Sequence, residues 1–259
     1  MITLYDIPTT TAIKATSGNV WKARFSLNYK GLPFKTEWIE MPDIESAVYR
    51  KHNLSAPTTR PDGSPKYTLP VIYDSSTDKA IADSFEIAKY LDATYPDTPK
   101  VFPDTKDGAE AGWNKQEVMI NTIMGHIFPI FPYYCRELLE KANPPTREYL
   151  NVVVAKDLAA FLKVQKIDEL KYTPEQNAEG VEKLKEGLGH LDEKFGGKGE
   201  FGWFLGDKIS FADFELGGLL LAMKNVWPGA EVWDTQISKW HGGKWATFVS
   251  KLEPYATVN

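Results

Sequence analysis

The hydrophobic pattern changes partway along the chain, and this change limits the folds that the sequence can adopt. The first 95 residues mix strand-like and helical segments, whereas the residues after about 105 repeat apolar side chains at helical spacing. A helix is predicted over 19–30, because Gly31 can end it and Pro33 lies just beyond. Alternating segments at 33–39 and 68–73 predict strands. We therefore expect a βαβ-type unit followed by a further strand and helix.

A segment rich in Pro, Asp and Thr, 96–105, separates the two patterns and is predicted to be a linker. Capping boxes at Thr173–Gln176 and Ser210–Asp213 predict two helix starts in the part that follows. A chain of 259 residues is long enough for two modest domains. The sequence therefore predicts an α/β domain over 1–95 and an all-helical domain over 106–259.

Charge and cysteine content exclude several classes of function. The chain carries 30 Lys and Arg against 35 Asp and Glu, a net charge of −5, which argues against nucleic acid as a partner. Cys135 is the single cysteine, so the chain has no internal disulfide and no cysteine-rich zinc site. The N-terminus lacks the pattern of a signal peptide, and no apolar run reaches membrane-spanning length. We therefore expect a cytosolic protein without a membrane partner.

Two other patterns give no support to cofactor or metal chemistry. Gly197, Gly199 and Gly202 have the spacing of a dinucleotide-binding fingerprint, but they follow a helical pattern rather than a strand, which favours a loop. The four histidines are too scattered for metal-ligand spacing, and no metal site is predicted from His52, His126, His190 and His241.

Ser17 lies where a loop meets the helix predicted over 19–30. Taken alone, this position favours a serine that caps the helix, because its side chain can accept a hydrogen bond from the first free N–H groups. In a second interpretation, the hydroxyl serves a ligand bound at the helix start. Segments further along the chain favour this second interpretation.

Two such segments together suggest a receptor for a small anionic peptide. Leu69–Pro70 opens a predicted strand, where a proline is tolerated only at an edge, an end or a turn, and a cis bond is one way to hold it. The backbone there can pair with an extended peptide. Asp83 and Ser84 begin another predicted helix. Two helix N-termini beside an open strand edge favour a bound anion.

These motifs together resemble those of cytosolic glutathione transferases. They occur in the order Ser17, then Trp21 and Arg24 within the helix, then Thr68–Val71, Asp83–Ser84 and Ser210-x-x-Asp213. The resemblance covers essentially the whole chain, and the helix that begins at a serine is similar to the serine classes of the family. Closer similarity to the fungal class A, etherase-related transferases of wood-decay fungi is carried by Asn28–Gly31, Pro42–Glu45, Pro61–Pro65 and Tyr67–Tyr73.

The resemblance implies a thioredoxin-like α/β N-terminal domain, with Pro70 in the cis form, and an all-helical C-terminal domain. It also implies that Ser17 donates its hydroxyl to the sulfur of glutathione, the cosubstrate, and Asn19 is a candidate supporting donor. Two features depart from near relatives: Gly18 stands where proline is expected, and the segment Thr10–Thr16 is unusual.

The same resemblance assigns the glutathione-binding residues. The Leu69 backbone would pair with the cysteinyl part of glutathione, in a segment that includes Thr68 and the turn at Pro70. Asp83 and Ser84 would hold the γ-glutamyl carboxylate and amine, and Ser84 would add its backbone N–H.

An aromatic and proline-rich run, 128–134, marks a break in a long helical pattern. Its side chains either form hydrophobic core at a kink or line a pocket for the second substrate. Aromatic rings stack on flat ligands, and tyrosine hydroxyls can bond to phenols or carbonyls. The candidate residues for this hydrophobic ligand site are Phe128, Phe131, Tyr133 and Tyr134. Trp227 and Trp233 could close the same cleft, but core packing is the favoured role for both.

The leading hypothesis is a glutathione transferase that activates the glutathione thiol for attack on hydrophobic aromatic electrophiles, with ether cleavage as a variant. The absence of a cysteine near Ser17 argues against disulfide reduction. A second hypothesis is a non-catalytic ligandin that binds aromatic or phenolic molecules, and a third is a structural module without glutathione affinity. The resemblance also implies a homodimer, in which the first domain of one chain meets the second domain of the other.

Overall fold

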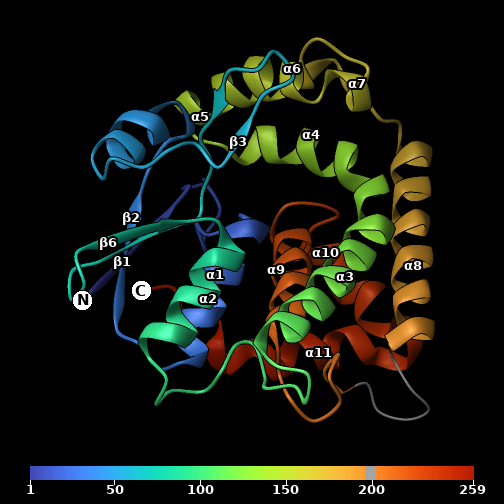
Figure 1. Ribbon diagram of the computed structural model, residues 1–259. Coiled ribbons are helices and arrows are strands. Elements are labelled where there is room, and N and C mark those ends of the chain that lie inside the picture. Colours follow the sequence, from blue (N-terminus) through green and yellow to red (C-terminus); the bar gives the residue numbers. More distant parts are fainter. Residues whose placement is uncertain (196–201) are drawn as a thin grey trace.

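The computed structural model describes residues 1–195 and 202–259 (Figure 1). Most of the glycine-rich segment 197–202 lies outside the described residues, so the loop predicted there stays a prediction. Within the described ranges, no helix combines the length and the apolar character needed to cross a bilayer.

The chain forms a mixed sheet with two helices, followed by a helical domain. The strands are β1 (Ile2–Asp6), β2 (Phe34–Trp38), β3 (Thr58–Thr59), β4 (Pro65–Lys66), β5 (Val71–Asp74) and β6 (Lys79–Ala82). The α-helices are α1 (Gly18–Tyr29), α2 (Ser84–Thr94), α3 (Ala109–Ile127), α4 (Phe131–Lys141), α5 (Pro144–Tyr149), α6 (Ala155–Asp157), α7 (Ala159–Leu162), α8 (Pro174–Phe195), α9 (Phe211–Asn225), α10 (Ala230–Thr235) and α11 (Lys244–Leu252). Short 3₁₀ segments are η1 (Met41–Asp43), η3 (Phe128–Ile130), η5 (Ile167–Glu169), η6 (Ile237–Gly243) and η7 (Glu253–Tyr255), and π-helical segments are η2 (Glu45–Arg50) and η4 (Leu150–Val154).

The main sheet has the strand order β2-β1-β5-β6. β1 and β2 run parallel and are joined through α1, which confirms the predicted βαβ unit. β5 and β6 add antiparallel strands. Helices α1 and α2 cover the face of the sheet that is turned toward the helical domain (Figure 1). This arrangement places the N-termini of α1 and α2, and the strand edge beside them, next to the second domain.

The helices and strands predicted for the first domain are present in the structure. The strands differ from the prediction in two ways: one starts later than expected, and some short strands were not predicted. α1 ends where expected, and Gly31 has the positive φ of +66° that glycine adopts readily. The strand predicted at 68–73 begins only at Val71, because the cis proline at Pro70 cannot donate a ladder hydrogen bond. The sequence reasoning missed β6 and the two-stranded β3–β4 hairpin, both of which are very short.

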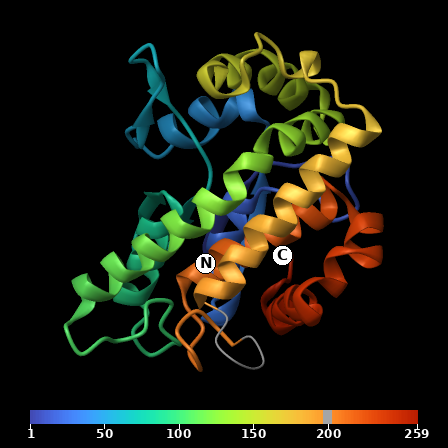
Figure 2. The ribbon, with the colours of Figure 1, turned by 90° about the vertical axis from the view of Figure 1, so that its right-hand side faces the viewer.

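In the second domain, α3 and α8 lie side by side (Figures 1 and 2). The predicted break in the first long helix is confirmed, since α3 and α4 are separated by η3. Both predicted capping boxes form. The Thr173 N–H donates to Gln176 Oε1 over 2.9 Å, and the Ser210 N–H donates to Asp213 Oδ2 over 2.8 Å. Trp227 and Trp233 are buried in the core, which is the role that the sequence favoured for both.

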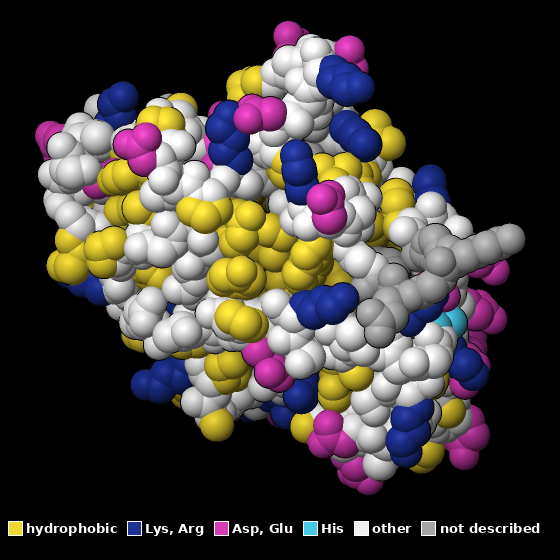
Figure 3. Space-filling view, turned by 90° about the horizontal axis from the view of Figure 1, so that it is seen from below, with side chains coloured by type: hydrophobic (Ala, Val, Ile, Leu, Met, Phe, Trp, Pro, Cys, Tyr) yellow, Lys and Arg dark blue, Asp and Glu magenta, His cyan; other side chains and the backbone are white. Residues whose placement is uncertain are grey.

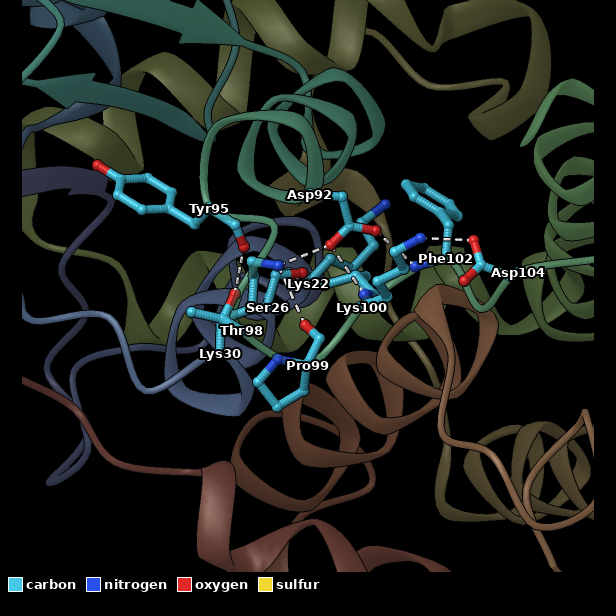
Figure 4. Close-up of polar contacts among 11 residues, drawn as sticks. Lys22, Ser26, Lys30, Asp92, Tyr95, Thr98, Pro99, Lys100, Phe102 and Asp104 are labelled. Atoms are coloured by element: carbon cyan, nitrogen blue, oxygen red, sulfur yellow. Dashed lines mark hydrogen bonds and ion pairs between the residues drawn. The ribbon is translucent and has the colours of Figure 1, made fainter. Parts of the chain in front are cut away.

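The segment predicted as a linker is anchored by one carboxylate (Figure 4). Asp92, near the end of α2, accepts hydrogen bonds from the backbone N–H groups of Val101 and Phe102 over 3.0 and 2.9 Å. Lys30 Nζ reaches the same carboxylate at 2.8 Å and also donates to the Pro99 carbonyl over 3.0 Å. Val101 and Phe102 are buried. These bonds fix the connecting segment to α1 and α2 of the first domain. The boundaries predicted at 95 and 106 stay predictions.

The two domains meet along α1 and α9. At the start of α1, a Cβ atom on Gly218 would lie 2.7 Å from the Gly18 carbonyl oxygen and 3.0 Å from Trp21 Cβ. Only glycine at position 218 allows the helices to approach this closely. One turn further on, Lys22 Nζ and Glu215 Oε2 form a buried ion pair at 3.0 Å. The position of the N-terminus of α1 is therefore set by α9.

We predict that Gly218→Ala destabilises the protein, because the added methyl group collides with backbone of α1. Such overpacking costs about 1–3 kcal/mol, which lowers the thermal midpoint of a chain of this size by about 2–10 °C. The matched control is Gly18→Ala on the facing helix, whose Cβ would meet Leu219 Cδ2 at an ordinary 3.4 Å. A Gly218→Ala midpoint equal to that of the control would contradict the close approach.

Candidate functional site

Ser17 is the N-cap residue of α1. Its Oγ accepts a long hydrogen bond of 3.4 Å from the Val20 N–H, and its carbonyl accepts one of 3.0 Å from the Trp21 N–H. The side chain is half-buried. Because the hydroxyl oxygen acts as an acceptor in the cap, its own proton is available to an acceptor outside the helix. The capping role and the ligand role of Ser17 are therefore compatible.

Ser17 opens into a cavity of about 230 Å³ between the two domains. Thr16, Ser17, Gly18 and Asn19 line one end of it, and side chains of the second domain form most of the remaining wall. That wall is apolar, with residues that include Met124, Ile127, Ile130, Phe131, Leu138, Leu219 and Met223. A mostly apolar cavity beside a hydroxyl group at a helix N-terminus suits an apolar substrate that reacts with an anion.

Three of the four aromatic residues predicted for the ligand site line this cavity: Phe128, Phe131 and Tyr134. Tyr133 does not line it, and the structure places this residue elsewhere. It is buried in the core, where its ring stacks on Trp227 and packs at a tilt against Tyr172, with ring centroids 5.2 and 4.3 Å apart. Successive residues of a helix project about 100° apart, so α4 sends neighbouring tyrosines to different surroundings.

Tyr134 and Cys135 are the polar side chains that α4 contributes to the cavity wall. The Tyr134 hydroxyl donates to the Thr16 carbonyl over 3.1 Å, and burial raises the pKa of this tyrosine. Burial also raises the pKa of Cys135 to about 12. Both groups are therefore protonated at neutral pH, and Cys135 is a small buried side chain rather than a nucleophile.

The Leu69–Pro70 peptide bond is cis, as the resemblance implied. Tyr49 Oη donates to the Thr68 carbonyl over 2.7 Å, which holds the segment before the turn. The Pro70 carbonyl accepts a 3.3 Å hydrogen bond from the Asp83 N–H, so the cis-proline turn and the start of α2 lie together. Within 1–195 and 202–259, no hydrogen bond uses the N–H or the carbonyl of Leu69. This backbone is therefore suited to pair with an added extended peptide.

Asp83 is the N-cap of α2, and Ser84 is its first residue. Asp83 Oδ1 accepts from the N–H groups of Phe85 and Glu86 over 2.8 and 3.2 Å, and Oδ2 has no partner among the described residues. Asp83 is exposed and has a φ of 76°, in the left-handed half of backbone space that non-glycine residues rarely occupy. Such outliers gather at functional sites, which makes Asp83 a candidate ligand-binding residue.

Some wall residues of the cavity were missed by sequence reasoning. They come from η1, from 142–154 and from α9, and include Met41, Ala142, Thr146, Leu150, Val154 and Ala222. The run 216–223 is the most apolar short run of the sequence. Its apolar character could have indicated that α9 contributes to an apolar wall. Nothing in the local sequence of 142–154 points to a site more than 100 residues away.

The described side chains that could bind a metal and the face seen in Figure 3 bear on a metal or polyanion partner. Within the described ranges, no three His, Cys, Asp or Glu side chains gather in a way that could hold a metal ion. Seen from below, one face shows hydrophobic side chains near its centre, with basic and acidic side chains interspersed around them (Figure 3). This mixture of charges provides no basic surface on that face for a nucleic acid.

Comparison with known proteins places this geometry in a family. A family model described as the glutathione S-transferase N-terminal domain matches residues 16–94, and one for the C-terminal domain matches residues 116–255. A curated relative, the glutathione S-transferase-like protein ustS of Aspergillus flavus, is 43% identical over 95 residues, which cover 35% of this chain and a third (33%) of that protein.

Solved fungal structures match over nearly the full length. The glutathione S-transferase CsGST63524 of Ceriporiopsis subvermispora, solved in complex with glutathione, is 36% identical, with a TM-score of 0.86 and coverage of 100% of this chain and 98% of that one. Glutathione transferase GSTFuA3 of Phanerochaete chrysosporium is 33% identical, with a TM-score of 0.85 and the same coverage, 100% and 98%. The predicted thioredoxin-like domain and all-helical domain are confirmed. The chain belongs to the glutathione S-transferase family.

Proposed function

We propose that this protein is a serine-type glutathione transferase in which Ser17 activates the thiol of glutathione. The observation that carries the proposal is the Ser17 hydroxyl at the N-terminus of α1, where it opens into the apolar cavity between the domains. A thiolate at this point would accept the free proton of the hydroxyl as a hydrogen bond. It would also face the positive end of the α1 dipole.

Glutathione would bind along the edge formed by the cis-proline turn and the start of α2. The Leu69 N–H and carbonyl would pair with its cysteinyl residue, between Thr68 and Pro70. Asp83 Oδ2 would take the γ-glutamyl amine, while the Ser84 hydroxyl and N–H would take the γ-glutamyl carboxylate. The free Leu69 backbone and the unpartnered Asp83 oxygen support this orientation. The structure of CsGST63524 contains glutathione, which supports the same ligand here.

The proposed chemistry requires a lowered thiol pKa. A thiol has an ordinary pKa of about 8.5 and reacts as the thiolate. A hydrogen bond to a charged group is worth about 1.5–3 kcal/mol, and 1.4 kcal/mol corresponds to about one pKa unit. The Ser17 hydroxyl would therefore lower the thiol pKa by about one to two units. The proton is released to solvent, and Ser17 itself stays protonated.

The thiolate would then attack an electrophilic carbon held in the apolar cavity. A carbon–sulfur bond forms, and the bond to the leaving group breaks with its electron pair going to that group. The aromatic rings of Phe128 and Phe131 favour an aromatic substrate. In the ether-cleaving variant, the leaving group is a phenolate that takes up a proton from water.

A ligandin is the second candidate, and the stacked rings at the surface of the cavity favour it. Phe128 and Phe131 line the cavity and stack on each other, with centroids 5.4 Å apart. Phe161, beside the cavity lining, packs at a tilt against Phe128 at 4.4 Å, and both Phe128 and Phe161 are 37% exposed. Accessible stacked rings can hold a flat aromatic molecule without any reaction. The two functions differ in whether binding is followed by turnover of glutathione.

We predict that Ser17→Ala raises the pKa of the bound glutathione thiol by about one to two units. The rate of conjugation at pH 6.5 falls about 10- to 100-fold, while rates at high pH approach those of the wild type, because the thiol then ionises without help. The measurement is the pH dependence of kcat/KM toward a panel of aromatic electrophiles, with glutathione affinity measured separately by calorimetry.

The control for this test is Asn19→Ala, which removes an exposed side chain from the same helix turn. We expect a smaller effect, since Asn19 is only a candidate supporting donor. A pH profile that is unchanged in Ser17→Ala would remove Ser17 from its proposed role.

We predict that a fluorescent, flat aromatic probe binds the cavity of the wild type and is displaced by the electrophilic substrate. Phe131→Ala weakens this binding about 5- to 50-fold, because one stacking ring is lost. Tyr133→Phe serves as the control, since Tyr133 lies in the core. If the protein binds glutathione and the probe but turns over no electrophile in the panel, the ligandin is the better description.

Two further expectations also stay predictions: the cytosolic location expected from the sequence, and the homodimer implied by the family resemblance. Light scattering coupled to size exclusion should give about twice the 29.2 kDa of one chain. A mass of one chain at micromolar concentration would contradict the dimer.

A further inference from the structure

A loop of the first domain leads to Ser17 and includes the segment Thr10–Thr16. β1 ends at Asp6 and α1 begins at Gly18, so residues 7–17 connect them. This connection has little regular structure of its own. The position of the Ser17 hydroxyl therefore depends on what holds this loop, and the main external support is α4 of the second domain.

α4 contacts the far end of the loop through its backbone. Thr9 forms an antiparallel bridge with Ala142, the residue that follows α4. The Thr10 N–H and hydroxyl both donate to the Lys141 carbonyl, over 2.8 and 3.0 Å. These bonds fix the beginning of the loop.

The near end of the loop is held by Tyr134. Its hydroxyl donates to the carbonyl of Thr16, the residue directly before Ser17, over 3.1 Å. Thr16 is only 1% exposed, so its carbonyl cannot exchange this partner for bulk water. Tyr134 and Lys141 are seven residues apart on α4, which is two helical turns, so both contacts come from the same face of the helix.

Inside the loop, the neighbouring carbonyl has its own anchor. The buried Trp21 side chain donates from Nε1 to the Ala15 carbonyl over 2.9 Å. Trp21 belongs to α1 and moves with it, so this bond ties the loop to its own helix. Among the hydrogen bonds of residues 1–195 and 202–259, the Tyr134 bond is the one that ties Thr16, the residue before Ser17, to the opposite wall of the cavity.

We propose that Tyr134 is a positioning residue: through the Thr16 carbonyl it fixes the Ser17 hydroxyl relative to the bound glutathione sulfur. This inference rests on the proposed function, in which Ser17 is the donor to the thiolate. Tyr134 lines the cavity with its ring, while its hydroxyl proton is used by the loop rather than offered to the second substrate. Burial raises the pKa of Tyr134, so the hydroxyl remains a donor across the working range of pH.

Tyr134→Phe tests this role, because it keeps the aromatic ring in the cavity wall and removes only the hydroxyl. The matched control is Tyr133→Phe, the same change one residue earlier on α4, in the core. The readouts are the pKa of the bound glutathione thiol, from the thiolate absorbance, and the separate values of kcat and KM for an aromatic electrophile.

We expect Tyr134→Phe to raise the thiol pKa by about half to one unit and to lower kcat near neutral pH about three- to tenfold. The KM for the electrophile should change less than about twofold, and the loss should shrink at high pH. In Tyr133→Phe, the thiol pKa should stay within about 0.3 unit of the wild-type value, and kcat should stay within about twofold.

Two outcomes would overturn the inference while leaving the proposed function intact. In the first, Ser17→Ala raises the thiol pKa but Tyr134→Phe does not. In the second, Tyr134→Phe raises only the KM for the electrophile, which would make its hydroxyl a substrate-binding group. If Ser17→Ala itself leaves the thiol pKa unchanged, the proposed role of Ser17 fails, and the positioning role fails with it.

Discussion

The close approach of α1 and α9 is the constraint on which the site depends. Gly218 lets the start of α1 lie against α9, where a methyl group would be 2.7 Å from the Gly18 carbonyl oxygen. The buried pair Lys22–Glu215 then fixes the helices one turn further along. Because the N-terminus of α1 is held in this way, Ser17 lies at the boundary between a glutathione-type binding edge and an apolar wall.

Each half of the site comes from a different domain, and neither half is sufficient alone. The first domain provides the groups suited to an anionic peptide: the open Leu69 backbone, the Asp83 carboxylate and two helix N-termini. The second domain provides the apolar lining from α3, α4 and α9. The reaction proposed for this family member needs both, because a thiolate gains reactivity when its electrophile is held in a dry space next to it. Asp92 of α2 binds the start of the segment that connects the two halves.

The second domain also contacts the loop before Ser17 directly. α4 supplies cavity wall with Phe131 and Tyr134 and, from the same helix, holds Thr10 and Thr16 of the loop before Ser17. The helix that would contact the electrophile is thus the one that supports the donor to the thiolate. Tyr134 has a different use from the phenol binding that its side chain suggested, because its only donor proton already has an acceptor in the protein.

The sequence by itself determined several local features. They are the end of the first helix just before Gly31, the break at 128–130, the capping boxes, and the serine, cis-proline and Asp–Ser motifs that led to the family. These depend on neighbours within a few residues, so periodicity and turn chemistry reveal them. Only the tertiary structure decided that Tyr133 is core while Tyr134 lines the cavity, that 142–154 closes it, and that Tyr134 bonds to Thr16, 118 positions earlier in the chain. Such contacts are set by how helices rotate and pack against each other, and a one-residue step on α4 changes the surroundings of a side chain completely.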